Sequence, residues 1–135
     1  MKNSDSNKTL LRNFFSAYGA GDARTMRQLL APDFVVHGMP PGYAGDTDGF
    51  IALAAAFKSA MSDCHNTVED LIAAEDDKVV ARFTTRFVHA SEILGVRPSG
   101  RRITTTGIEV YRLADGKIAE LWGEYNMAEL FQSQP

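Results

Sequence analysis

The chain has 135 residues, of which 44% are hydrophobic, and a formal net charge of -3. This length and hydrophobic content predict one domain spanning residues 1–135 with a core of its own. The acidic balance excludes the basic footprint of a nucleic-acid or anionic-membrane binder and favours a small-molecule ligand.

No targeting or membrane signal stands out in the sequence. The N-terminal segment lacks the uninterrupted apolar region of a signal peptide, and no stretch approaches the roughly 20 apolar residues of a membrane helix. We therefore expect a cytoplasmic protein. Cys64 is the only cysteine in the sequence, which excludes an internal disulfide and a cysteine metal cluster.

Helical periodicity marks the beginning of the chain. Apolar residues recur at the i, i+3, i+4 and i+7 spacing, which predicts a first helix that Ser6 or Asn7 caps and Gly19 ends. Asp22 can cap a second, shorter helix, which Pro32 ends.

A strand at residues 34–37 and a Pro- and Gly-rich loop at residues 38–45 precede the third predicted helix. Asp46 or Asp48 caps this helix, which ends near Ser62. Alternating polarity then predicts strands at residues 67–74, 78–90, 102–113 and 117–126. Helices followed by antiparallel strands indicate an α+β fold, with three helices packed on one side of a curved sheet that encloses a pocket.

Side-chain parity separates two faces of the long strand at residues 78–90. The face expected to point into the interior carries Val79, Ala81, Phe83, Thr85, Phe87 and His89. The outer face, with its continuation on the next strand, carries Arg82, Thr84, Arg86, Thr104, Thr106 and Ile108. Because an open curved sheet must cover its convex side, we expect this outer face to form a homodimer contact.

The last strand has an unusual face. At a period of two, Ile118, Glu120, Trp122, Glu124 and Asn126 point one way, and the residues between them point the other way. Two carboxylates, an indole and an amide on one face suit a polar pocket with an aromatic wall. The alternative is an edge strand with its charges in water and Trp122 covering a gap.

Four motifs carry a resemblance to a known family. They read P-D-F-x-x-H at residues 32–37, H-x-x-E-x-x-G at 89–95, P-S-G at 98–100 and Y-R-x-x-D-G-K-I-x-E-x-W at 111–122. In order and spacing they resemble the SnoaL-like polyketide cyclase family, from about residue 8 to Gln132. The resemblance implies the cone-shaped α+β barrel of the nuclear transport factor 2-like superfamily, with a curved antiparallel or mixed sheet and a dimer through its convex face.

Characterised members of that family close a polyketide ring by intramolecular aldol condensation, without metal or cofactor. They use an Asp near the end of the last strand as general base, and this position matches Asn126 here. An amide cannot hold a proton at neutral pH, so Asn126 suits a hydrogen-bond donor to an enolate, or a structural amide at a strand end. Glu124, which shares its face, is the substitute base, and Glu120 is a deeper structural or substrate-binding residue.

His37 and His89 match histidines of the family motif, and either can titrate near neutral pH. By parity His89 enters the pocket with Phe83 and Phe87, although a neutral core histidine fits the same position. His37 is a pocket residue or an exposed loop histidine. The two histidines are well separated and give no ligand spacing of the zinc kind, so we expect no metal.

Substrate-binding residues follow from aromatic content and from the family's loop over the cavity. They are Trp122, Phe83, Phe87, Tyr43, Phe50, Met39 and Glu120. The function predicted is cofactor-free proton abstraction next to a carbonyl, with stabilisation of the enolate, on a small or polyaromatic compound. Two alternatives stay open: epoxide opening on the same fold, and a ligand-binding protein that lacks the base.

Overall fold

Four helices and five strands make up the part of the chain that the structure, a computed structural model, describes, residues 2–132. The elements are α1 (Lys2–Ala20), α2 (Ala23–Leu29), β1 (Leu30–Val36), α3 (Thr47–Ala60), β2 (Met61–Ala74), β3 (Lys78–His89), β4 (Arg102–Ala114), β5 (Lys117–Asn126) and α4 (Ala128–Gln132). All three predicted helices and all five predicted strands are present. The five-residue α4 is an addition to them.

Side-chain caps fix the starts of α2 and α3. Asp22 accepts hydrogen bonds from the backbone N and the hydroxyl of Thr25, at 3.1 and 2.6 Å. Asp46 accepts from the backbone N of Gly49 at 2.9 Å. A Cβ on Gly49 would stand 1.8 Å from the carbonyl oxygen of Ala44, so the loop can enter α3 this closely only with glycine at that position.

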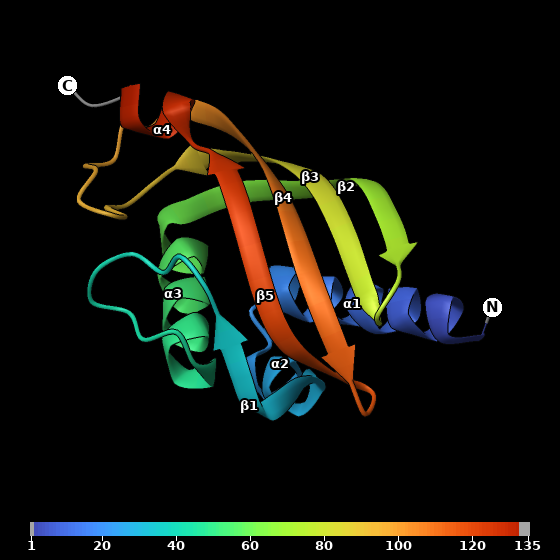
Figure 1. The fold of residues 1–135 in the computed structure, drawn as a ribbon. Helices are drawn as coiled ribbons and strands as arrows, with labels where there is room; N and C mark the ends of the chain where they lie inside the picture. The colour runs from blue at the N-terminus through green and yellow to red at the C-terminus, as the bar shows by residue number, and fades with distance from the viewer. Residues whose placement is uncertain (1, 133–135) are drawn as a thin grey trace.

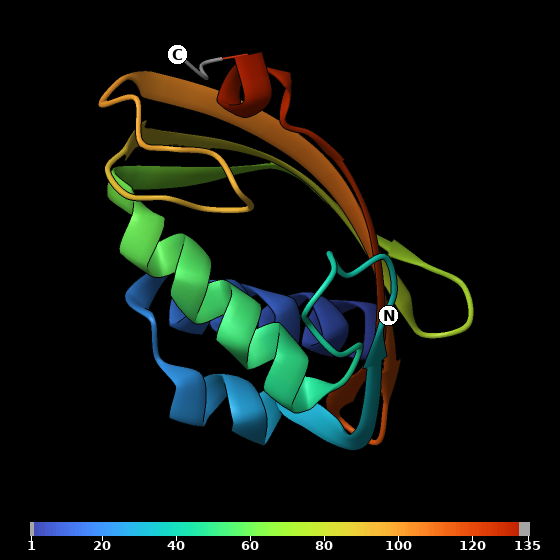
Figure 2. The same cartoon turned by 90° about the vertical axis from the view of Figure 1, so that its left-hand side faces the viewer.

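The strands form one mixed sheet in the order β1-β5-β4-β3-β2. β1 runs parallel to β5, and the other neighbouring pairs are antiparallel. The sheet is strongly curved, and α1, α2 and α3 lie on its concave side (Figures 1 and 2). The predicted α+β architecture, with three helices against a curved sheet, is therefore confirmed.

Two apolar clusters hold helices and sheet together. The larger one joins Leu11 and Phe14 of α1 to Tyr111 of β4 and Leu121 of β5. The second cluster lies at the other end of the sheet, where α4 inserts the fully buried Leu130. Between the two clusters, Tyr125 on the concave face of β5 is about half exposed.

Strand faces follow the prediction on β3 and depart from it on β5. Val79, Ala81, Thr85, Phe87 and His89 are buried, as the interior assignment of β3 requires. On β5 a bulge opposite the Arg112–Leu113 step interrupts the alternation. Beyond it the inward residues are Leu121, Gly123 and Tyr125.

The face assignment of β5 is therefore corrected. Trp122 pairs with Val110, Glu124 with Ile108, and Asn126 with Thr106. Cross-strand partners share a face, and Ile108 is 48% exposed on the convex side. Glu120, Trp122, Glu124 and Asn126 thus lie outside the cone, because the bulge and the packing of Leu121 turn the other set inward.

Candidate active site

Glu109 lies on the concave face of β4, in the same row of the sheet as small residues. The residues directly opposite it are Ala81 on β3 and Gly123 on β5. Gly107 and Tyr111 are its neighbours on the same face of β4. Glu109 is partly buried at this position.

Two tyrosine hydroxyls donate to this carboxylate. Tyr111 Oη donates to Oε1 at 2.5 Å, and Tyr125 Oη donates to Oε2 at 2.7 Å. Each carboxylate oxygen has one tyrosine donor and keeps lone-pair capacity for another partner. Burial raises the pKa of Glu109, and the two hydrogen bonds partly offset this because they favour the ionised form.

The phenols of the cluster remain protonated. Burial raises the pKa of Tyr111 and Tyr125, and the charge of Glu109 raises both further. The pKa of Tyr18, on α1, is raised by burial first and by Glu109 second. Among these groups, Glu109 is the one whose pKa burial moves toward neutral pH, whereas the tyrosine pKa values move away from it.

Tyr111 is fixed by the core. Only 2% of it is exposed, and its ring meets Phe14 and Phe15 edge to face, with ring centroids 6.2 and 5.8 Å away. Its hydroxyl consequently holds Oε1 of Glu109 in one place.

Tyr125 occupies a space that two glycines leave free. A Cβ on Gly123 would stand 2.2 Å from Tyr125 Oη, and one on Gly107 would stand 2.5 Å from Phe83 Cζ and 2.8 Å from Tyr125 Cδ1. The Tyr125 ring can therefore lie across β5 and β4 and reach Glu109. Phe83 supports it, with the two ring centroids 6.2 Å apart.

The concave face continues beyond Tyr125 toward β2. Val68, opposite Phe83, is 43% exposed and extends the apolar row. In the next row Thr85 donates to Asn66 Oδ1 at 2.6 Å, and Thr105 lies opposite Thr85. An apolar row beside a row of hydroxyl and amide groups suits a small organic molecule that carries oxygen substituents.

A cleft of about 200 Å³ opens between α1, α2 and α3. It is lined by Tyr18, Gly21, Ala23, Met26, Ile51, Ala54, Ala55, Lys58 and Ser59. Tyr18 borders this cleft, and the charge of Glu109 raises its pKa after burial has done so.

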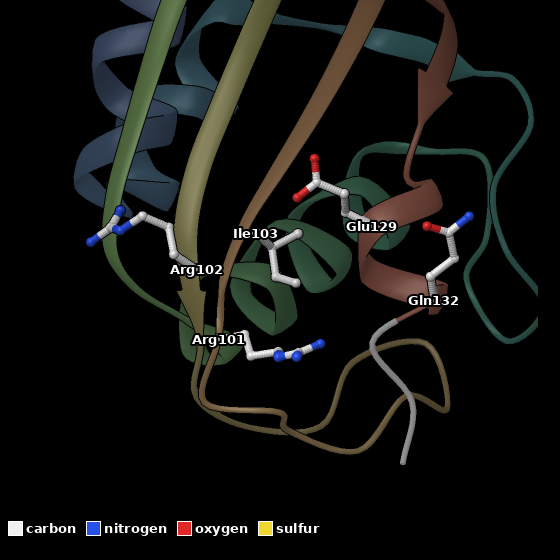
Figure 3. Close-up of a pocket in the computed structure, with 5 residues that line it drawn as sticks. All are labelled: Arg101, Arg102, Ile103, Glu129 and Gln132. Atoms are coloured by element: carbon white, nitrogen blue, oxygen red, sulfur yellow. The ribbon is translucent and has the colours of Figure 1, made fainter.

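A second hollow, of about 250 Å³, lies beside α4 (Figure 3). It is lined by Arg101, Arg102, Ile103, Glu129 and Gln132. Arg102 pairs with Asp63, and Glu129 accepts a hydrogen bond from the backbone N of Thr104. Arg102 and Glu129 thus have partners of their own at the rim of the sheet, and Glu109 does not line this hollow.

The predicted residues of the convex face form a cluster of their own. His37 Nε2 and Glu120 Oε2 are 2.6 Å apart, and Arg112 Nε donates to Glu120 Oε1 at 3.0 Å. The His37 ring stacks on Trp122, at 5.2 Å between centroids, and Lys78 Nζ lies 5.7 Å from the indole centroid. The hydrogen bond to His37, and then Arg112, lowers the pKa of Glu120.

His89 and Phe87 belong to the second apolar region of the molecule. Both are fully buried, as parity predicts, and among the described residues neither ring nitrogen of His89 has a hydrogen-bond partner. Ala81 is the β3 residue opposite Glu109, and His89 comes eight residues later. At about 3.3 Å per residue this is about 26 Å along the strand, so the two groups do not act on one atom.

Asn126 ends β5 in a structural contact. Its Oδ1 accepts a hydrogen bond from the backbone N of Ala128, at the start of α4, at 3.1 Å. Glu124 is exposed beside it on the convex face. The structure therefore does not bring Asn126, Glu124, His37 and His89 together, and their predicted catalytic roles stay predictions.

The predicted rim residues divide between core and surface. Phe50 packs between Phe14 and Phe34, with ring centroids 5.8 and 5.7 Å away. Met39 lies against the same core, and Tyr43 is exposed in the loop before α3. Within residues 2–132, no group of three or more His, Cys, Asp or Glu is arranged to hold a metal ion.

Glu109 was the residue that the sequence reasoning missed. The sequence does contain a signal for it. Glu109 is a carboxylate on the same strand face as Gly107 and Tyr111, and as the buried Ile103 and Leu113. An ionisable residue inside an apolar alternation indicates a functional site better than charges on a mixed face do.

A model of the SnoaL-like polyketide cyclase family matches residues 8–133. The chain belongs to the SnoaL-like polyketide cyclase family. The curved sheet with its helices agrees with the cone fold of this family, and the family assignment is consistent with a small-molecule ligand.

Solved structures of similar proteins support the SnoaL-like assignment. TsrD from Streptomyces laurentii is 30% identical over 96% of this chain and 94% of its own, with a TM-score of 0.84. IdmH from Streptomyces antibioticus, a proposed polyketide cyclase, is 28% identical over 98% of both chains, with a TM-score of 0.77. AclR from Streptomyces galilaeus, a proposed hydroxylase, is 26% identical over 96% and 95%, with a TM-score of 0.82.

No curated protein matches the chain. In the described part of this SnoaL-like chain, no helix is both long and apolar enough to cross a membrane.

Proposed function

We propose that this SnoaL-like protein is an enzyme that removes a proton from the carbon next to a carbonyl group, with Glu109 as the general base. The enolate that results can close a ring by intramolecular aldol attack, or take the proton back at another carbon as in an isomerisation. The observation that carries this proposal is the carboxylate on the concave face with a raised pKa and a tyrosine donor on each oxygen.

The surroundings of Glu109 fit such a base. Desolvation makes the carboxylate more basic than in water, whereas the two tyrosine hydrogen bonds act against this rise in pKa because they favour the ionised form. The row of Val68, Phe83 and Tyr125 offers apolar contact to a planar substrate. Thr85, whose hydroxyl donates to Asn66, and Thr105 form a polar row beside the apolar one.

The two alternatives left open by the sequence have less support. Epoxide opening would need an Asp and an Arg together at the site. Arg82 instead pairs with Asp70, and Arg112 with Glu120, on the convex face. A ligand-binding role was suggested by the amide at position 126. Glu109 supplies a carboxylate inside the cone and removes that argument.

Exchange of an acidic C–H proton tests the proposal directly. In D₂O the wild type should accelerate deuterium uptake at C1 of 2-tetralone, a planar enolisable ketone, followed by proton NMR. Glu109→Gln should lose on the order of a hundredfold or more of the catalysed rate, because a general base typically contributes that much. Glu124→Gln, a matched change on the convex face, should keep the wild-type rate. Exchange at the buffer rate in the wild type, or full activity in Glu109→Gln, contradicts the proposal.

We also propose that the protein is a homodimer through its convex face. Arg82 lies opposite Ile108, Thr84 opposite Thr106, and Arg86 opposite Thr104, so the six residues predicted to form the contact share one surface. Ile108 and Ile72 are large apolar side chains about half exposed on β4 and the edge strand β2. Contact with a second copy would remove them from water.

A further inference from the structure

We infer that Tyr125 is a second catalytic residue, whose hydroxyl holds the substrate's carbonyl oxygen while Glu109 takes the proton from the neighbouring carbon. This inference rests on the proposed role of Glu109 as the base. It assigns different tasks to two tyrosines that donate to the same carboxylate.

The two tyrosines differ in access. Tyr111 is 2% exposed and enclosed by Phe14 and Phe15, so no substrate reaches its hydroxyl without opening the core. Tyr125 is 51% exposed, and its ring lies against two glycines and Phe83. A molecule on the concave face can therefore touch Tyr125, whereas Tyr111 serves to position Glu109.

The position of the Tyr125 hydroxyl matches the geometry of the reaction. Tyr125 Oη is 2.7 Å from Glu109 Oε2, so Oε2 is the carboxylate oxygen on the side of the half-exposed tyrosine. A carbonyl oxygen is two bonds away from the α-carbon. A substrate whose α-carbon approaches Oε2 consequently brings its carbonyl oxygen close to the Tyr125 hydroxyl.

The hydrogen bond changes partner as the proton moves. Glu109 Oε2 accepts the α-proton, the C–H electron pair becomes the new C=C bond, and the carbonyl π pair moves onto oxygen. Before this step the carboxylate is the stronger acceptor for Tyr125. After it Glu109 is a neutral acid and the enolate oxygen is the stronger acceptor, so the hydroxyl stabilises the charge where it develops.

Tyr125 keeps its own proton throughout this step. Burial and the charge of Glu109 raise its pKa, which disfavours a phenolate. Tyr125 thus acts as a neutral hydrogen-bond donor, and the proton that the substrate loses stays on Glu109 until it is returned to carbon.

Phenylalanine substitutions at the two tyrosines separate their roles. Each removes one hydrogen bond to Glu109, so each should shift the rise of the pH–rate profile of 2-tetralone exchange to higher pH. At the plateau above this rise, Tyr125→Phe should lose about tenfold or more of the rate, and several-fold more than Tyr111→Phe loses. Both variants keep the aromatic ring, and thermal melts check that they fold.

Binding of 2-naphthol, a planar mimic of the 2-tetralone enolate, gives a second readout. Its affinity should fall about tenfold in Tyr125→Phe and less in Tyr111→Phe.

Equal plateau losses in the two variants, or a wild-type plateau in Tyr125→Phe, overturn the inference. If Glu109→Gln is inactive while Tyr125→Phe keeps its plateau, Glu109 remains the base and only the role of Tyr125 fails. If Glu109→Gln is active, the proposed function itself fails.

Discussion

At the scale of single residues, Glu109 combines a cost to stability with its proposed role as the base. Its carboxylate sits where burial disfavours charge, and its partners Tyr111 and Tyr125 offset this only in part. A residue that the fold tolerates at a cost is a better candidate for function than one that the fold needs.

The raised pKa of Glu109 predicts a pH-dependent effect of its removal. A carboxyl whose folded-state pKa lies above its unfolded value contributes stability that is fully present below the unfolded pKa and is lost as pH rises through the folded pKa. Glu109→Gln lacks this dependence. Its melting temperature relative to the wild type should therefore rise as the pH goes from below the ordinary glutamate range to neutral. Thermal melts of both proteins at matched pH measure this, and a difference that does not change with pH would refute it.

At the scale of single elements, the period-two pattern predicted where strands lie better than which face points inward. On β3 the interior set, down to the buried His89, is as the alternation predicts. On β5 the bulge opposite the Arg112–Leu113 step places Ile118 and Glu120 on opposite faces of the sheet, although they are two residues apart. A bulge depends on how two strands pair, so parity along one strand cannot reveal it.

The link between β5 and α4 gives a prediction for Asn126. Because its side chain accepts a hydrogen bond from the first turn of α4, Asn126→Ala should destabilise the protein by about 1 kcal/mol. Asn126→Asp keeps an acceptor oxygen and should stay close to the wild type. Denaturant unfolding of the three proteins compares them. An alanine variant as stable as the wild type would show that this contact contributes nothing.

At the scale of the whole molecule, the family motifs predicted the architecture and left the site to be found. The convex cluster of His37, Glu120 and Trp122 is made of positions that belong to the family motifs. The contacts of His37 with Glu120 and Trp122 link the end of β1 to β5. Packing between these two strands therefore accounts for the presence of these residues in the motifs. The concave site instead depends on Glu109, Tyr111 and Tyr125, whose meeting across two strands is a tertiary property.

The proposed dimer can be tested on the convex face without touching the concave site. Ile108→Asp puts a charge in the middle of the predicted contact, so the protein should become a monomer in light scattering at micromolar concentration. Asp115→Asn, a change of charge in the β4–β5 turn, is the matched control and should remain a dimer. A wild type that is itself monomeric contradicts the proposal.

The glycines under Tyr125 have a consequence for any redesign of this protein. Because the ring fills the volume that Gly107 and Gly123 leave empty, neither glycine can be enlarged while Tyr125 keeps its place. A library that enlarges position 123 has to give up the tyrosine at 125, and with it a donor to Glu109. Substitutions aimed at new substrates are better placed at Val68 and Asn66 of the edge strand. Both side chains are exposed, so larger ones there displace no residue of the Glu109 cluster.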